Sequence, residues 1–122
     1  MEERRRFVRL DTRVEVEYTP LPSTDRKTSV TKNISAGGIC LITDKELTPG
    51  ARLQVAMKLL DRDQPVHFTG EVVWSEAYEM IGKTQRQRAV ENGIRFVEIA
   101  PQDQETVMRH VILTLQPPAP PR

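Results

Sequence analysis

The sequence has 122 residues, enough for one domain that buries its own hydrophobic core without disulfides or structural metals. Its formal net charge is only +1, from 18 basic and 17 acidic residues, and arginines crowd the amino terminus. A protein that neutralises many nucleic-acid phosphates usually carries a broad basic face. The charge therefore argues against nucleic acid as the partner and favours a small anion.

An arginine-rich arm, residues 1–12, opens the chain. Its basic side chains lie close together in the sequence: Arg4, Arg5, Arg6 and Arg9. The next segment, 13–18, alternates polar and apolar residues, which is the period of a strand with one buried face. A turn-rich stretch over 19–27 separates it from a second predicted strand at 28–33.

Paired glycines after the second strand indicate a tight turn at 33–38. Residues 38–43 are apolar at successive positions, so we expect a strand covered on both faces. The clearest period of two comes at 53–59, which predicts a fourth strand. A fifth strand is expected at 66–74, where Gly70 permits a bend or a bulge.

Residues 77–88 are mostly polar and predict a loop, and 89–99 follow as a sixth strand. Six strands with turn signals between them, and no room for parallel crossovers, predict an antiparallel β-barrel. After Pro101, apolar residues recur at helical spacing: Val107, Met108, Val111, Ile112 and Leu115. They predict a helix of about four turns that packs this face on the barrel. The barrel and helix would span 13–116, followed by a proline-rich tail at 117–122.

The only cysteine, Cys40, stands within the apolar run 39–42, where a small buried hydrophobe fits. It has no second cysteine for an internal disulfide, so a reducing, cytoplasmic location is the expectation. The amino terminus is charged rather than apolar, and no run approaches the length of a membrane span. We therefore expect neither a signal peptide nor a membrane anchor.

Two short motifs contain the residues best suited to binding. The first is Arg5-Arg6-Phe7-Val8-Arg9, extended by Arg4, and the second is Asn33-Ile34-Ser35-Ala36-Gly37-Gly38. The planar guanidinium of arginine donates two parallel hydrogen bonds to a phosphate or to the O6/N7 edge of guanine. The amides of a tight glycine turn can also face a ligand. A guanine nucleotide offers both kinds of target.

Together, in this order and ahead of a run of strands, the two motifs resemble the bacterial PilZ domain. That family is a receptor for cyclic di-GMP, and its signature is Arg-x-x-x-Arg followed by Asp/Asn-x-Ser-x-x-Gly. The resemblance implies a six-stranded barrel with a carboxy-terminal helix, which agrees with the strand pattern. It also implies that the arginine arm folds over the ligand.

The resemblance implies a role for each arginine of the arm. Arg4, Arg5 and Arg9 would bond phosphates and the Hoogsteen edges of guanine, and Arg6 would be a supporting charge. Each charge-assisted contact of this kind contributes about 1.5 to 3 kcal/mol.

The barrel side of the implied site comes from the second motif. Asn33 and Ser35 would take polar atoms of a guanine, and Gly37 and Gly38 would let the backbone approach the ligand. Asn33 departs from the commoner aspartate. An amide offers one acceptor oxygen and no charge, whereas a carboxylate offers two acceptor oxygens and a negative charge. Trp74 lies where some relatives stack an aromatic ring on guanine. By simple alternation it shares a face with Val66, Phe68 and Val72.

We therefore expect a cytoplasmic, non-enzymatic receptor for cyclic di-GMP. The ligand would order the arm against the barrel and create a surface for a protein partner in a motility, adhesion or polysaccharide pathway. One alternative is a PilZ-fold interaction module without nucleotide binding. Another is a small nucleic-acid-binding barrel that uses the arm on phosphates, although few aromatic residues are available for a stacking platform.

Enzymatic and metal-dependent functions are disfavoured by the motifs. The sequence has no phosphate-binding GKS loop, Ser-His-Asp grouping or paired-carboxylate motif. His67 and His110 are far apart and lack neighbours at metal-ligand spacing, so neither a metal nor another cofactor is expected.

Overall fold

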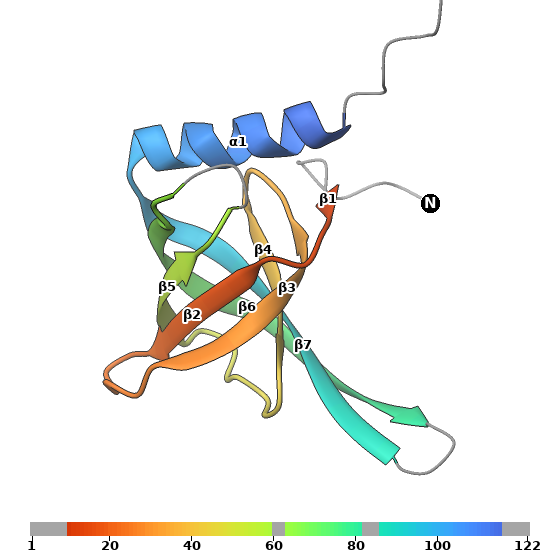
Figure 1. Cartoon of the computed structure of the whole chain (residues 1–122). Helices are drawn as coiled ribbons and strands as arrows, with labels where there is room; N and C mark the ends of the chain where they lie inside the picture. The colour runs from red at the N-terminus through yellow and green to blue at the C-terminus, as the bar shows by residue number, and fades with distance from the viewer. Residues whose placement is uncertain (1–9, 60–62, 82–85, 116–122) are drawn as a thin grey trace, which may run out of the picture.

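Seven strands and one helix make up the described part of the chain, residues 10–59, 63–81 and 86–115 of a computed structural model (Figure 1). Their bounds are β1 Leu10–Asp11, β2 Glu15–Pro20, β3 Lys27–Ile34, β4 Gly38–Thr43, β5 Arg52–Met57, β6 Val66–Ile81, β7 Arg86–Ile99 and α1 Pro101–Leu115. All strand pairings are antiparallel. Strands β3, β2, β5, β6, β7 and β4 close into a ring, because β4 pairs again with β3. The predicted six-stranded barrel with a carboxy-terminal helix is confirmed.

The short strand β1 is an addition to this ring. It pairs with the end of β3, at Asn33 and Ile34, while β2 pairs with the beginning of the same strand. Between β1 and β2, the buried Thr31 hydroxyl donates to the carbonyl of Thr12 at 2.7 Å and accepts from the amide of Val14 at 3.0 Å. Thr31 therefore fixes the bend that lets both segments follow one edge of β3.

Strands β6 and β7 form a hairpin that extends beyond the barrel (Figure 1). Their pairing continues from Ala77 with Val90 to Ile81 with Arg86, so the loop predicted over 77–88 is wrong. A two-stranded ribbon outside the barrel meets solvent on both faces, and its residues do not need to alternate. The paired Glu79 and Arg88 are both exposed, which explains why the sequence read as polar.

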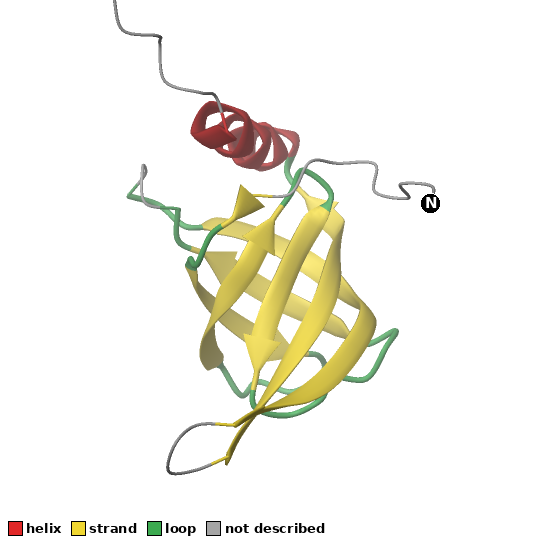
Figure 2. Ribbon diagram, turned by 90° about the vertical axis from the view of Figure 1, so that its right-hand side faces the viewer, coloured by secondary structure: helices red, strands yellow, loops and turns green. Residues whose placement is uncertain are grey.

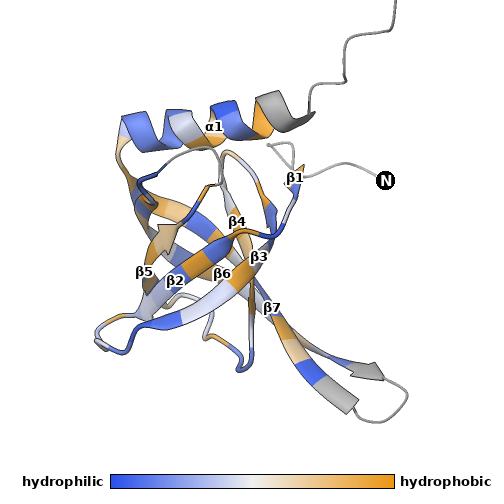
Figure 3. Ribbon diagram, viewed as in Figure 1, coloured by the Kyte–Doolittle hydropathy of each residue, from blue (hydrophilic) through white to orange (hydrophobic). Residues whose placement is uncertain are grey.

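The core lies inside the barrel, under strands whose hydropathy alternates, as β2 shows in Figure 3. One row of paired residues crosses five strands and is buried throughout: Leu10, Ile34, Ile39, Ile94 and Val72. Complete burial of such a side chain stabilises the folded state by about 1.5 to 3 kcal/mol. This row therefore ties β1 to the barrel from the inside.

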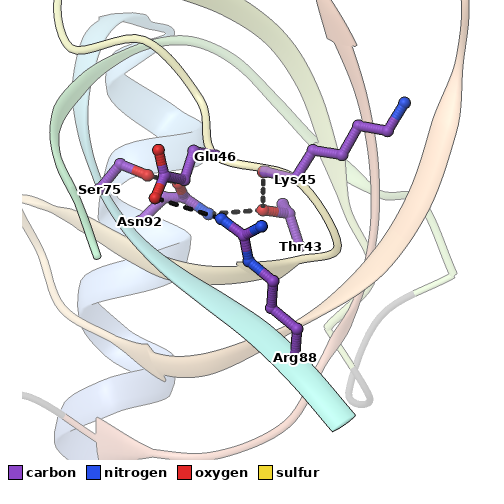
Figure 4. A network of polar contacts seen from close by, with 6 residues as sticks. All are labelled: Thr43, Lys45, Glu46, Ser75, Arg88 and Asn92. Atoms are coloured by element: carbon purple, nitrogen blue, oxygen red, sulfur yellow. Dashed lines mark hydrogen bonds and ion pairs between the residues drawn. The ribbon is translucent and has the colours of Figure 1, made fainter. Parts of the chain in front are cut away.

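A buried polar network joins β4, β6 and β7 near the base of the long hairpin (Figure 4). The side-chain amide of Asn92, a fully buried residue, donates to the backbone carbonyl of Leu41 at 3.0 Å and to the hydroxyl of Thr43 at 2.9 Å. Its carbonyl oxygen accepts from the hydroxyl of Ser75 at 2.7 Å. Because every polar atom of Asn92 is paired, its burial does not leave an unsatisfied group.

Helix α1 lies across one end of the barrel (Figures 1 and 2). Val107 and Val111 are buried against the barrel. Met108 and Ile112, predicted on the same buried face, are instead 41% and 53% exposed. Each residue turns about 100° around a helix, so the positions that follow the two valines rotate toward solvent. The side chain of Leu115 lies outside the described residues. Among the described segments, none forms a helix both long enough and apolar enough to span a lipid bilayer.

Closure of the barrel between β4 and β7 requires glycine at position 38. A Cβ there would stand 2.0 Å from the carbonyl oxygen of Ile94 and 2.9 Å from the Cα of Arg95, both of them backbone atoms. We expect Gly38→Ala to lower the free energy of unfolding by about 1 to 3 kcal/mol, the usual cost of overpacking. Urea denaturation measures this change. A midpoint equal to that of the wild type would contradict the required close approach.

The buried Tyr18 makes the free energy of unfolding depend on pH in the alkaline range. Burial raises the pKa of its phenol, and the negative charge of Asp44 adds to the shift. The folded state therefore holds the phenol proton more tightly than the unfolded state, and this contribution is lost as pH rises above about 10. We expect the urea midpoint of the wild type to fall more steeply between pH 9 and 11 than that of Tyr18→Phe. Parallel pH profiles of the two proteins would contradict this origin.

Candidate functional site

The turn that joins β3 and β4 is held by its own serine. The amide of Ser35 donates to the carbonyl of Gly38 at 2.9 Å, and its hydroxyl donates to the same oxygen at 3.2 Å. The amide of Gly37 in turn donates to the Ser35 hydroxyl at 3.2 Å. Ser35, predicted to contact a ligand, thus also gives the turn its shape.

The two glycines connect this turn to β7. The carbonyl of Gly37 accepts from the amide of Phe96 at 3.0 Å, and Gly38 packs against the Ile94 carbonyl. We expected both glycines to admit a ligand. For Gly38, the atom that a side chain would strike belongs to β7, so its small size serves barrel closure.

Trp74 lies on the outer face of β6, and the prediction that it shares a face with Val72 is wrong. Val72 pairs with Ile94, whereas Trp74 pairs with Gly93, the residue before Ile94. Successive residues of a strand point to opposite faces, and Ile94 points into the core. The register shift at Val73 inserts one extra residue, which reverses the alternation.

The indole of Trp74 rests on Gly93. A Cβ at Gly93 would stand 2.2 Å from the indole Nε1 and 2.6 Å from Cε2. Only a glycine lets the ring lie this close to the sheet. Trp74 is half-buried, so part of its ring also meets solvent.

Five paired residues cross the outer face of the barrel in one line, which we call the outer row. From β1 to β6 they are Asp11, Asn33, Cys40, Gly93 and Trp74. Adjacent strands lie about 4.8 Å apart, so about 14 Å separate the backbones of Asn33 and Trp74. The structure therefore brings these two predicted ligand contacts to the same face.

The first described residues of the chain lie beside the same turn. Arg4, Arg5, Arg6 and Arg9 lie outside the described residues. Leu10, which follows Arg9 directly, pairs with Ile34, between Asn33 and Ser35. The point where the arm enters the barrel is thus next to the Asn33–Gly38 turn.

Sequence reasoning missed a cation next to the outer row. Lys32 is the extra residue in the register shift between Thr31 and Asn33, and its ammonium contacts the carboxylate of Glu91 at 2.6 Å. The hydrogen bond that Lys32 donates to Glu91, and then the negative charge of Glu91, raise the pKa of Lys32. The bulge that turns Lys32 toward Glu91 has no clear sequence signal, because neither glycine nor proline marks it.

Other features of the described surface do not coincide with the outer row. A groove of about 380 Å³ runs over β2 and β3, and it is lined by Glu15, Val16, Glu17, Thr28, Ser29, Val30 and Lys58. Across residues 10–59, 63–81 and 86–115, no three His, Cys, Asp or Glu side chains are grouped to hold a metal ion. The described arrangement is thus a glycine turn, with the polar Asp11 and Asn33 at one end of the outer row and the aromatic Trp74 at the other.

A family model for the PilZ domain matches residues 3–113, which include both motifs. The chain belongs to the PilZ domain family. The match covers the arm, the barrel and most of the helix, so the resemblance of the two motifs extends to the whole domain.

Solved structures share this PilZ fold at low sequence identity. The PilZ domain of YcgR from Escherichia coli, solved with c-di-GMP, has a TM-score of 0.74 and 17% identity, covering 91% of each chain. The K. pneumonia MrkH–c-di-GMP complex has a TM-score of 0.75 and 17% identity, over 93% of this chain and 52% of MrkH. The Bacillus subtilis inhibitor of motility MotI has a TM-score of 0.67 and 20% identity, over 93% of this chain and 51% of MotI.

These likenesses show the fold alone, and the chain spans about half the length of MrkH and of MotI. Among curated proteins, no match is found.

The contact between Gly93 and Trp74 can be tested without a ligand. A methyl group in Gly93→Ala should push the indole off the sheet, because the two would overlap. Trp74 is the only tryptophan, so its fluorescence reports this directly. We expect the emission of Gly93→Ala to shift to longer wavelength in the folded protein.

Gly50→Ala is the control for a strained glycine replacement that leaves the indole alone, because its φ of +91° disfavours a side chain but a Cβ there would meet nothing within 4 Å. Its emission should stay at the wild-type position. A Gly93→Ala spectrum that also stays there would contradict the position of the ring.

Proposed function

We propose that this chain is a non-enzymatic receptor for cyclic di-GMP. The observation that carries the proposal is the pairing of Leu10 with Ile34, which places the residue directly after Arg9 beside the Asn33–Gly38 turn. The proposal is that the arginines before Leu10 act together with this turn on one ligand. PilZ relatives solved with c-di-GMP, from YcgR and MrkH, support this choice of ligand.

The arm supplies the positive charge for two phosphates. Arg4, Arg5 and Arg9 bond phosphate oxygens and the Hoogsteen edges of guanine, and Arg6 adds a supporting charge. A guanidinium can donate in parallel to either target, which a lysine ammonium cannot do. The arm therefore recognises both chemical parts of the nucleotide.

The barrel supplies a polar edge and a stacking surface. Asn33 and the remaining hydrogen-bonding capacity of Ser35 take polar atoms of a guanine, beside the backbone of Gly37 and Gly38. At the other end of the outer row, Trp74 stacks on a guanine, a contact that contributes about 1 to 3 kcal/mol.

Binding is proposed to order the arm against the barrel and so to create a new surface for a protein partner. Helix α1 is close enough to take part, because it packs against β1 and β6. The side-chain amide of Gln104 also donates to the backbone carbonyl of Ala36, in the turn, at 3.5 Å. The location is proposed to be cytoplasmic, and the partner to act in motility, adhesion or polysaccharide synthesis.

One observation favours an alternative, a PilZ-fold interaction module that does not bind the nucleotide. Met108 and Ile112 expose apolar surface on α1, one turn apart. Such a strip could contact a protein whether or not cyclic di-GMP is bound. Calorimetry separates the two functions, because only the receptor gives heat with the nucleotide.

The arm can be tested by titration calorimetry with cyclic di-GMP. Arg5→Ala and Arg9→Ala should each weaken binding by about 10- to 100-fold, since each removes a charge-assisted contact. Unchanged affinity in both variants would remove the arm from the site. Wild-type protein that gives no heat at micromolar concentration would overturn the proposed ligand.

Arg26→Ala is the matched control for lost charge. Arg26 is exposed at the far end of β2 and β3, where its guanidinium lies 3.8 Å from the carboxylate of Glu17. Its replacement should leave the affinity within about twofold of the wild type, because isolated surface ion pairs contribute little.

A further inference from the structure

Asp11 places a carboxylate at the start of the outer row. It is the second residue of β1, it is exposed, and it pairs directly with Asn33 of β3. Directly opposed residues of an antiparallel pair have Cβ atoms about 4.5 to 5.5 Å apart. The carboxylate of Asp11 and the amide of Asn33 therefore stand side by side on the face that Trp74 also occupies.

The position of Asp11 is fixed from both sides. Its neighbour Leu10 is buried against Ile34, which turns Asp11 outward. The amide of Thr12 donates to the carbonyl of Lys32 at 3.2 Å, which continues the pairing beyond β1. Asp11 is therefore presented from a paired backbone rather than from a free loop.

The Watson–Crick edge of guanine carries two adjacent donors, N1–H and the 2-amino group. A carboxylate has two acceptor oxygens that can take both in parallel, whereas the Asn33 side chain has one acceptor and no charge. Hydrogen bonds to an ionised acceptor are also about twice as strong as neutral ones. Adenine has an acceptor at N1, which a carboxylate would repel.

Resting on the proposed function, we propose that Asp11 reads the Watson–Crick edge of one guanine of cyclic di-GMP and so determines base specificity. Three strand spacings, about 14 Å, separate Asp11 from Gly93, where the indole of Trp74 rests. One base does not span this distance. Asp11 and Trp74 therefore act on different guanines of the same ligand.

The test compares cyclic di-GMP with cyclic di-IMP, in which each base lacks the 2-amino group. Affinities for both are measured by calorimetry with wild type, Asp11→Asn and Asp11→Ala. We expect the wild type to prefer cyclic di-GMP, and Asp11→Ala to weaken its binding about tenfold. The affinity of Asp11→Ala for cyclic di-IMP should fall less, so that its preference for cyclic di-GMP is smaller than that of the wild type. The preference of Asp11→Asn should lie between those of the wild type and Asp11→Ala.

Trp74 fluorescence gives a second readout. At saturating cyclic di-GMP, Asp11→Ala should quench the tryptophan as fully as the wild type does, because the stacked guanine is a different one. Asp25→Ala, which removes an exposed carboxylate from the β2–β3 turn, is the control and should keep the wild-type preference.

Each other outcome has a distinct meaning. If Asp11→Ala changes both affinities by the same factor, upward or downward, Asp11 acts on the arm or on the phosphates and the inference is overturned. In that case the wild type still binds cyclic di-GMP, so only the inference fails and the proposed function stands. If the wild type binds neither ligand, the proposed function fails as well.

Discussion

The pairing of Leu10 with Ile34 is the constraint on which the rest of the site depends. Inside the barrel it buries Leu10 in the core. Outside, the same pairing sets Asp11 beside Asn33 and places the residue that follows Arg9 beside the turn. Because the side-chain period of a strand is two, a slip of one residue would turn the apolar side outward and the polar side inward. The outer row thus takes its register from the packing of the core.

Two glycines each allow a close approach that a side chain would block. Gly38 admits the backbone of β7, and Gly93 admits the indole of Trp74. A side chain at Gly38 would act on stability, whereas one at Gly93 would act on the position of the aromatic ring. Of these two glycines, one therefore closes the barrel and the other shapes the proposed ligand surface.

The strands and the helix were largely predictable because period two and the glycine turns are local signals. The motifs also predicted that the arginines act with Asn33, and the structure places Leu10, the residue after Arg9, beside that turn. The outward position of Trp74 was not predictable, because a bulge at Val73 reverses the alternation without a glycine or proline to announce it. The hairpin beyond the barrel was missed because its sequence is mostly polar, as in the pairing of the exposed Glu79 with the exposed Arg88. Pairing of Asp11 with Asn33 depends on long-range register, which local patterns do not encode.

The most direct test of the central claim measures energy transfer between the arm and the barrel. Trp74 serves as the donor, and an acceptor dye is attached at Glu3→Cys in a Cys40→Ala background, which leaves one reactive thiol. If the arm folds over the ligand on the outer row, saturating cyclic di-GMP should increase transfer beyond the quench seen without the dye. Unchanged transfer, in protein that calorimetry shows to be saturated with the nucleotide, would contradict the account.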